Sequence, residues 1–592
     1  MSVTRNRRGP SDVTPYVMVA ILGTIIALVL GTWLAVLVGA ALEDKPTPSG
    51  NPFAAVINLL AGKVSWPGTA ATVVAAVEAV GVPALAVIAW RLVRRNRQPR
   101  LSVDAAARHL ANRREQTALS REGAAATAAR LGAPATHPGV RIGRARGTGQ
   151  PLYGSWEDMH VDIWGPRTGK TTSRAIPAIL DAPGAVLVTS NKRDIVDATR
   201  LARNEAGQVW IFDPQRVADE PPTWWWNPLT YVTDIEKAVK LAGVFAAYSK
   251  EPDAKTDAFF DPEGQALLAF LILAATEGKQ PITKLYSWVS DPTDTTPVDI
   301  LRSAGHDLPA DGVQGVINSP DKQRAGVYGT AKKSVGFLVN PAITRWVTPD
   351  RSNPDRPQFD PHDFVRGSGT LYSLSREGQG TAGPLVTALT VATIEAAEEL
   401  ATRSPGGRLR TPMLGVLDEA ANVCRWKDLP DLYSHYGSRG IPLMTILQSW
   451  AQGVVVWGEY GMKKLWSASN IRMYGGGVSE TQFLGDLSQL VGDFEPETHS
   501  ISIQRGSMAS RSTSISTRTE KIFEVADLAA LPRGRALLLA SGTRPILIET
   551  EPWQHGPHAQ TVRASLAKYA PPEEMPLHEL IAADAEGSDA GR

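Results

Sequence analysis

Six short apolar runs constrain the fold of this chain most strongly. They are HVDIW (160–164), AVLVTS (185–190), VWIFD (209–213), TLYSLS (370–375), MLGVLDE (413–419) and PLMTILQ (442–448). Short runs that are apolar throughout are typical of strands buried on both faces, and helical stretches separate them. This alternation predicts an α/β fold with a parallel sheet covered by helices. The stretch 523–553 predicts edge strands that return to this sheet, joined by a turn at Gly542.

The regions between these runs suggest a domain organisation. Residues 229–350 contain long amphipathic stretches and hardly any strand pattern, which indicates an inserted all-α domain. The α/β domain would then consist of residues 151–228 and 351–555. Before it, residues 101–131 predict a helix and 132–150 a linker rich in Gly, Pro and Arg, so that 101–150 form a connecting region. Residues 556–592 predict a flexible tail.

An N-terminal membrane region is predicted over residues 1–100. Residues 16–42 carry no charge, and 27 residues of helix span roughly 40 Å against a hydrocarbon core of about 30 Å. Residues 69–90 form a weaker second apolar run, interrupted by Glu78 and Pro83. The outer flanks are rich in arginine, which predicts two transmembrane helices with both termini in the cytoplasm. A cleaved signal peptide is the alternative for the first run.

Composition excludes several classes of protein. The 592 residues are enough for two or three domains, and 61 basic against 60 acidic residues exclude a polyelectrolyte. Cys424 is the single cysteine, so that disulfides within the chain and cysteine-based zinc sites are excluded.

The stretch WGPRTGKTT at 164–172 resembles a phosphate-binding loop that is one residue short. Counting back six positions from Lys170 reaches Trp164, and the glycine stands at 165. A predicted strand precedes the turn and a helix start follows it, which favours nucleotide binding over a Gly-rich turn with an exposed lysine. Lys170 would contact the β and γ phosphates of ATP, and the Thr171 hydroxyl would bind Mg²⁺. The predicted phosphate contacts are Gly165, Pro166, Arg167, Thr168, Gly169, Lys170, Thr171 and Thr172.

Two carboxylates end the predicted strand 413–419. Asp418 and Glu419 follow an apolar run, where one acid would hold Mg²⁺ and the next would polarise the attacking water. The alternative is an acidic N-cap for the following helix.

Two further polar residues are candidates for sensing the nucleotide. Gln448 ends the next predicted strand, where its amide could report loss of the γ phosphate; capping of the strand is the alternative. Arg439 precedes that strand on a predicted loop, where its guanidinium could reach the nucleotide of a neighbouring subunit. A solvated or ion-paired arginine is the alternative reading of Arg439.

Taken together, the motifs resemble a known family. GPRTGKTT, TSNKRD, IFDPQ, WNPL, LDEAANV and SRGIPLMTILQS occur in this order behind two predicted spans. In this order they are similar to the TraG/TraD family of type IV secretion coupling proteins, ATPases of conjugative DNA transfer, over roughly residues 150–550. The resemblance implies a RecA-like motor domain with an inserted all-α domain, anchored as a homo-hexamer on the cytoplasmic membrane. It also implies ATP and Mg²⁺ as cofactors and, as partners, a relaxase bound to single-stranded DNA and the subunits of a secretion channel.

On this resemblance Lys170 and Thr171 take the Walker A roles, Asp418 and Glu419 the Walker B roles, Gln448 the sensor role and Arg439 the arginine-finger role. Two alternatives stay open. One is a membrane-anchored ring translocase for duplex DNA or for protein export. The other is a substrate receptor that has lost ATP hydrolysis, a reading favoured by the shortened loop.

Overall fold

The computed structural model describes residues 14–77, 101–134, 136–249, 257–378, 380–495, 497–504, 510–517 and 519–571. The chain divides into two compact units, Met1–Leu101 and Ser102–Arg592.

The first unit contains helices α1 (Thr14–Leu42) and α2 (Pro52–Leu60). The Asn51 side chain caps α2, since its oxygen accepts from the N–H of Phe53 at 3.0 Å. The predicted apolar span 16–42 coincides with α1. The second predicted span, 69–90, lies outside the described residues from Glu78 onward. Among the helices of the described residues, none combines the length and the apolar character needed to cross a bilayer.

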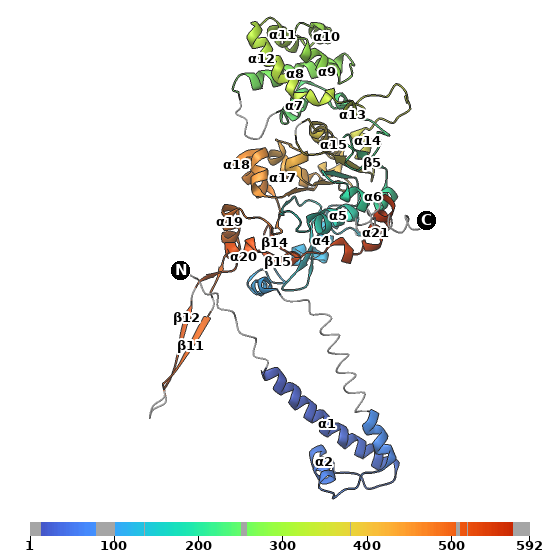
Figure 1. Cartoon of the computed structure of the whole chain (residues 1–592), viewed down its shortest axis with the longest axis vertical. Helices are drawn as coiled ribbons and strands as arrows, with labels where there is room; N and C mark the ends of the chain where they lie inside the picture. The colour runs from blue at the N-terminus through green and yellow to red at the C-terminus, as the bar shows by residue number, and fades with distance from the viewer. Residues whose placement is uncertain are drawn as a thin grey trace, which may run out of the picture. The chain divides into compact units, whose positions relative to one another are not determined.

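The second unit is built on one sheet of eleven strands (Figure 1). Across the sheet the order is β2 (Pro151–Gly154), β1 (Val140–Ala145), β15 (Ile546–Glu549), β14 (Arg535–Ala540), β9 (Ile471–Tyr474), β3 (His160–Ile163), β8 (Leu443–Leu447), β7 (Leu414–Leu417), β4 (Val186–Ser190), β6 (Thr370–Leu374) and β5 (Val209–Phe212). The strands from β9 to β5 run parallel, and β14, β15, β1 and β2 extend the sheet antiparallel. All six predicted apolar runs are strands of the parallel part, so the predicted α/β fold is confirmed.

Helices cover both faces of the parallel part. In β4, Val186 and Val188 pack into one core together with α5 (Ile176–Asp181) and α6 (Asp194–Ala206). Leu187, which points to the opposite face, belongs to a second core. That core includes α15 (Gly383–Arg403), α16 (Ala420–Val423), α17 (Leu429–Ser438) and α18 (Trp450–Ala468). Burial on both faces explains why the six runs are largely apolar without an alternation of apolar and polar residues.

Between β5 and β6, the described residues form helices and loops, with two isolated β-bridges and no named strand. After the turn η4 (Pro228–Tyr231) follow α7 (Ile235–Ala246), α8 (Phe260–Glu277), α9 (Lys284–Ser290), α10 (Thr296–Ser303), α11 (Asp307–Ile317), α12 (Asp321–Ser334), η5 (Gly336–Val339), α13 (Pro341–Thr344) and α14 (Pro361–Phe364). Figure 1 shows α7 to α12 gathered next to the end of the sheet where β5 lies. Helix α8 is their centre, since it buries residues all round and packs on α7 and α12. Their standing as a separate domain stays a prediction.

Three predictions for the connecting segments are corrected. Residues 101–131 form two 3-10 turns, η1 (Ser102–His109) and η2 (Thr117–Leu119), and the short helix α4 (Arg121–Arg130) instead of one helix. The predicted linker 132–150 contains β1, because its polar residues alternate with buried ones such as Val140 and Ile142. The predicted tail, 556–592, contains a packed helix, α21 (Ala559–Tyr569), which follows the 3-10 turn η7 (Trp553–His555).

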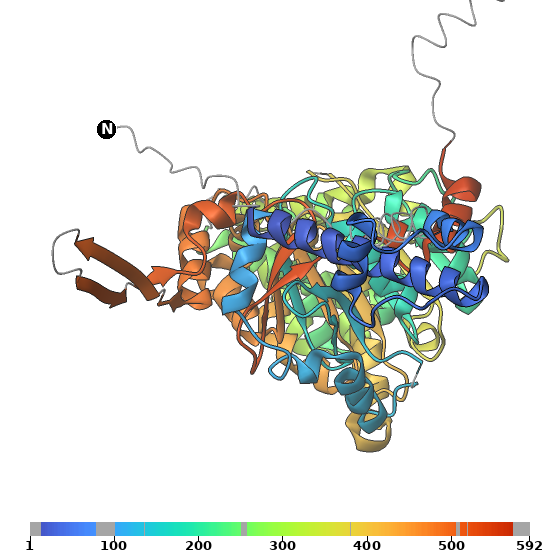
Figure 2. The ribbon, with the colours of Figure 1, turned by 90° about the horizontal axis from the view of Figure 1, so that it is seen from below.

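The remaining elements follow β9. They are α19 (Thr481–Val491), β10 (Asp493–Phe494), β11 (Glu497–Gln504), β12 (Ser510–Thr517), β13 (Glu520–Lys521) and α20 (Val525–Ala529). Strands β11 and β12 pair only with each other, as an antiparallel hairpin of eight residue pairs. Figures 1 and 2 show this hairpin extending from the rest of its unit. The Ser/Thr/Arg stretch around residue 512 therefore lies in a strand.

Candidate nucleotide site

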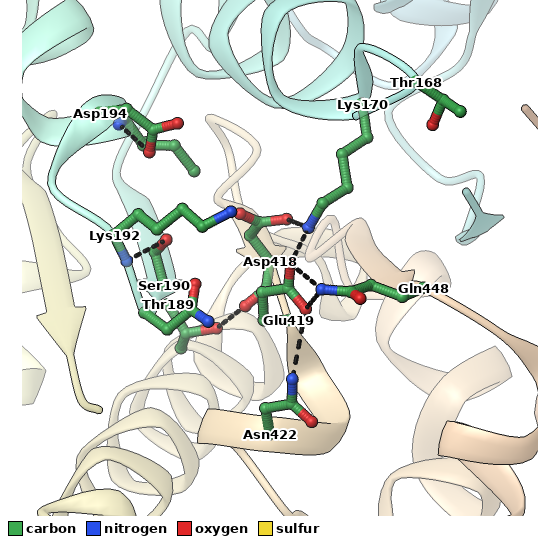
Figure 3. A network of polar contacts seen from close by, with 12 residues as sticks. Thr168, Lys170, Thr189, Ser190, Lys192, Asp194, Asp418, Glu419, Asn422 and Gln448 are labelled. Atoms are coloured by element: carbon green, nitrogen blue, oxygen red, sulfur yellow. Dashed lines mark hydrogen bonds and ion pairs between the residues drawn. The ribbon is translucent and has the colours of Figure 1, made fainter. Parts of the chain in front are cut away.

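Three neighbouring parallel strands end at the predicted nucleotide site. β8 lies between β3 and β7, and its Leu447 pairs with Ile163 of β3. Because carboxyl ends of parallel strands meet at one edge, the loops after β3, β8 and β7 leave the sheet together. Figure 3 shows Lys170, Asp418, Glu419 and Gln448 pointing toward one another at this edge.

A compact cluster of charges joins these loops. The Lys170 ammonium lies 2.8 Å from Oδ1 of Asp418 and also contacts Oε1 of Glu419. Gln448 donates its amide N–H groups to both carboxylate oxygens of Glu419 at 2.8 Å. The side chains of Lys170, Asp418 and Glu419 are 10%, 3% and 0% exposed. These residues, predicted separately from three strand ends, are brought together by the fold.

Burial and charge set the protonation of this cluster. Burial alone would lower the pKa of Lys170, but the carboxylates of Asp418 and Glu419 outweigh it and raise that pKa above its ordinary value. Lys170 is therefore a cation at neutral pH. Burial raises the pKa of Asp418 by more than the Lys170 ammonium lowers it. Two acids at one strand end thus depend on a single buried lysine for their counter-charge.

The loop from Trp164 to Lys170 has the backbone of a tight turn. Arg167 has φ 60° and Gly169 has φ 96°, so the turn uses the left-handed region twice. Thr168 fixes the turn, since its hydroxyl donates to the carbonyl of Gly165. Of the predicted phosphate contacts, Pro166 and Arg167 are exposed, which leaves the outer side of the loop open to solvent.

Gly165 has a steric requirement that the sequence alone did not explain. Its N–H donates to the carbonyl of Gly476 at 2.9 Å, and a Cβ atom at this position would lie 2.2 Å from the carbonyl oxygen of Gly477. The loop therefore rests on the glycine run after β9. This close approach of two backbones explains why the glycine stands at position 165.

A helix continues directly from the loop. Its first turn, Thr171–Ala175, has π geometry and leads into α5. The predicted metal ligand Thr171 is half-buried at the first position of this turn. Thr172 donates its hydroxyl to the carbonyl of Gly169 at 3.1 Å, so that it supports the turn. The strand, loop and helix predicted from the sequence are therefore present in this order.

Glu419 adopts an unusual backbone conformation. It has φ 56° and ψ 41°, in the left-handed region that non-glycine residues rarely occupy, and it begins α16. Such conformations cost about 1–3 kcal/mol and are concentrated at functional sites. Here the conformation brings the Glu419 side chain to Lys170 and Gln448.

A second group of polar residues around Glu419 was not predicted. Asn422 donates to Glu419 Oε2 at 3.4 Å and to Glu377 Oε1 at 2.8 Å. Asn191, after β4, also donates to Glu377. The loops after β4 and β6 are thus tied to Glu419. The TSNKRD motif, which contains Asn191, was the one signal in the sequence for this connection.

Arg439 does not join the site within one chain. It caps the end of α17, before β8 begins, and its guanidinium donates to the hydroxyl of Thr402 at 2.7 Å. Gln448 follows β8 at its other end, and a strand of five residues spans roughly 16 Å. Arg439 therefore lies toward the opposite edge of the sheet from Lys170, and its action on a neighbouring subunit stays a prediction.

A buried ion pair anchors the loop from below. Arg174, in the π turn, lies 2.8 Å from Oδ2 of Asp162 on β3, and both side chains are fully buried. Arg174 also donates to the carbonyl of Arg141 at 2.8 Å and contacts the imidazole of His160 at 3.1 Å. The helix after the loop is thereby fastened to the strand before it. Nothing in the spacing of these residues predicted the pair.

The oxygen donors of the site can be compared with the ligands that the predicted Mg²⁺ prefers. In the described residues, no group of three or more His, Cys, Asp or Glu side chains is arranged to hold an ion. Mg²⁺ differs from most metals in taking one or two protein oxygens and completing its shell with phosphates and water. The carboxylate of Asp418 and the hydroxyl of Thr171 fit that pattern.

Sequence comparison finds known proteins that are similar to this chain around these residues. A family model described as the TraM recognition site of TraD and TraG matches residues 412–533, which include Asp418, Glu419, Arg439 and Gln448. The type IV secretion system-coupling protein VirD4 of Bartonella quintana (strain Toulouse) is 21% identical over 364 residues. This match covers 57% of the chain and 53% of VirD4, so the chain spans about half the length of that relative. The resemblance to the TraG/TraD family of coupling proteins is confirmed.

Among solved structures, the conjugative coupling protein TrwBdeltaN70 in its unbound monoclinic form is 17% identical, with a TM-score of 0.48. It covers 67% of this chain and 85% of its own. TrwB in complex with ADP and Mg²⁺ is 15% identical, with a TM-score of 0.49 and coverage of 68% and 88%.

Proposed function

We propose that this chain is an ATP-hydrolysing coupling protein of conjugative DNA transfer. It would recruit a relaxase bound to single-stranded DNA and drive the strand into a type IV secretion channel. The observation that carries the proposal is the contact of Lys170 with Asp418 and Glu419, beside Gln448, at the carboxyl ends of three adjacent parallel strands. A RecA-like motor requires these groups in one place.

The residues suggest a division of roles. The Lys170 ammonium, which contacts both acids here, would turn to the β and γ phosphates of ATP and leave Glu419 to Gln448 and Asn422. Glu419, held by those amides, would accept a proton from the attacking water as a general base. Asp418 and Thr171 would hold Mg²⁺, whose charge would offset that of the phosphates.

Assembly and location are part of the proposal. Since Arg439 lies away from the site of its own chain, a homo-hexameric ring would let it reach the nucleotide of a neighbour. The uncharged run 16–42 and the arginines around the two predicted spans favour attachment to the cytoplasmic membrane, with the ATPase domain in the cytoplasm.

ATP hydrolysis by the full chain tests the proposal. We expect turnover that single-stranded DNA stimulates more than duplex DNA does. Lys170→Ala should abolish it, because this variant removes the phosphate contact and leaves Asp418 and Glu419 without their cation. Lys463→Ala, at an exposed position of α18, is the matched control and should hydrolyse ATP like the wild type.

Each alternative has its own outcome. Mg-ATP binding without hydrolysis would support a receptor that has lost its activity. Stimulation by duplex DNA alone would support a duplex translocase. Turnover that is the same in wild type and Lys170→Ala would contradict the nucleotide site itself.

A further inference from the structure

A polar cleft lies at the edge of the sheet that β5 forms, beyond the carboxyl end of that strand. One part, of about 320 Å³, is lined by Asp213–Arg216 and by residues near α13. An adjoining part, of about 430 Å³, is lined mainly by residues of the 345–356 segment. Both parts include Pro222 and Arg345, so we treat them as one site and call it the arginine cleft.

Five arginines from three chain segments line the arginine cleft. They are Arg216, Arg345, Arg351, Arg356 and Arg376. Arg345, Arg351 and Arg376 are exposed, and in the part of the chain that the structure describes their guanidinium groups have no ion pair. Arg216 has only a distant pair, 3.9 Å from an exposed Asp219. The cleft thus has an excess of positive charge, since five arginines and three acids line it.

The acids of the cleft are already occupied by other donors. Asp213 accepts from the backbone N–H groups of Val217 at 2.7 Å and Ala218 at 2.8 Å. Glu220 pairs with Arg200, which lies outside the cleft. Asp350 accepts from the N–H of Ser352 at 2.8 Å and from its hydroxyl at 2.6 Å. These carboxylates therefore offset the charge of the five arginines only in part, and Asp350 acts on Arg356 without forming an ion pair.

Arg356 is the most informative of the five. Its side chain is buried, with the residue 6% exposed, yet no carboxylate lies within ion-pair distance among the described residues. Two guanidinium nitrogens donate to backbone carbonyls, those of Thr348 and Pro222, and the buried Nε has no partner. Burial lowers the pKa of Arg356, although that group stays charged. A buried cation with an unused donor is suited to bind an anion.

An aromatic cluster holds the walls of the cleft in place. Trp224 packs edge-on against Trp346 at 5.7 Å and in a tilted arrangement against Phe359 at 5.3 Å, which joins the segment after β5 to the segment after α13. Backbone bonds reinforce this junction, as in Trp226 N to the carbonyl of Trp346 at 2.9 Å. The arginines therefore project from fixed walls, which reduces the entropy lost on binding.

We propose that the arginine cleft binds the phosphodiester backbone of single-stranded nucleic acid. Guanidinium groups match phosphate oxygens in geometry and charge, and five of them across two adjoining hollows exceed what one phosphate can contact. The choice of nucleic acid rests on the proposed function, in which single-stranded DNA is the cargo.

Binding of a fluorescein-labelled oligothymidylate to the full chain, without nucleotide, tests this proposal by fluorescence anisotropy. The variant Arg345→Gln/Arg351→Gln removes two exposed charges and should fold normally. We expect about tenfold weaker binding at low salt, and a slope of log K against log salt that is shallower by about 0.7 for each arginine removed. Arg356→Lys, which keeps the charge but loses the fork of donors, should also weaken binding.

The control is Arg302→Gln/Arg366→Gln, which removes two exposed arginines elsewhere on the same unit. An equal loss of affinity in the control, or none in the cleft variant, would overturn the proposal. Competition by polyglutamate, or by ATP or inorganic phosphate, as effective as that of unlabelled oligothymidylate would also overturn it. Because no nucleotide is present in this assay, its outcomes can be interpreted even if the chain proves unable to hydrolyse ATP. The cleft variants should retain basal ATP hydrolysis.

Discussion

The nucleotide site and the arginine cleft differ in how their charges are paired. Beside β3, β8 and β7, the buried charges are paired: Lys170 contacts both acids, and Arg174 is paired with Asp162. Beside β5, Arg345 and Arg351 have no ion pair among the described residues, and the buried Arg356 has none either.

This contrast separates two kinds of binding site. A site whose charges compensate one another is stable without ligand, and a ligand must exchange with an existing contact. A site with unpaired cations on fixed walls offers its charges directly to an anion. A site with paired charges suits a reaction step in which the protein alternates between bound states. A site with unpaired cations suits a polyanion that stays bound while it moves.

The largest expected effect comes from Glu419→Gln in the compensated site. Removal of the general base should lower ATP hydrolysis about 10²- to 10⁴-fold, with nucleotide binding retained because the amide is isosteric. Hydrolysis and nucleotide affinity of the full chain measure the two quantities. Glu459→Gln, at an exposed position of α18, is the control. Hydrolysis that stays at the wild-type rate would exclude Glu419 as the base.

The next effect concerns stability, through Arg174→Met. This substitution leaves Asp162 buried without its cation, which costs about 3–5 kcal/mol in the free energy of unfolding. Urea unfolding followed by tryptophan fluorescence measures the loss. Arg174→Met/Asp162→Leu should recover much of it, because no charge is then buried alone. A loss no larger than that of Arg403→Met, at an exposed position, would show that the pair does not anchor the loop.

A smaller effect is expected for an exposed ion pair, through Arg544→Gln. The Arg544 guanidinium lies 2.6 Å from Glu115 and, with the N–H of Asn112, lowers the pKa of Glu115 from 4.5 to about 2. Since the unfolded chain binds this proton first, the pair contributes stability above pH 4.5 and loses it as the pH falls toward 2. The difference in unfolding midpoint between variant and wild type should narrow over that range. A difference independent of pH would mean that Arg544 acts through packing alone.

The smallest effect on stability belongs to the arginine cleft. Arg345→Gln removes an exposed cation without a partner, so the free energy of unfolding should change by no more than about 0.5 kcal/mol. Urea unfolding under the conditions used for Arg174→Met gives a direct comparison. A loss above about 1 kcal/mol would mean that Arg345 stabilises the chain, and the contrast between the nucleotide site and the arginine cleft would then fail.

The parallel strands and the nucleotide site could be predicted because their signals are local. Leu414–Leu417 is apolar throughout because both faces of β7 are covered, and the acids follow where the strand leaves the core. The same logic placed Gln448 after β8. Local signals did not predict β1, whose residues resemble a linker in the sequence. These residues form a strand because they pair with β15, some 400 residues away.

The amino-acid sequence by itself determined the α/β class, the order of strand, loop and helix around Lys170, and the identity of the residues that meet there, because burial and turn formation depend on neighbouring residues. Only the tertiary structure decided that Gly165 must fit against Gly477, that Arg174 is paired with Asp162, and that Arg356 is buried without an ion pair among the described residues. Each of these features depends on which distant segments the sheet brings into contact. The spacing of residues along the chain does not predict such contacts.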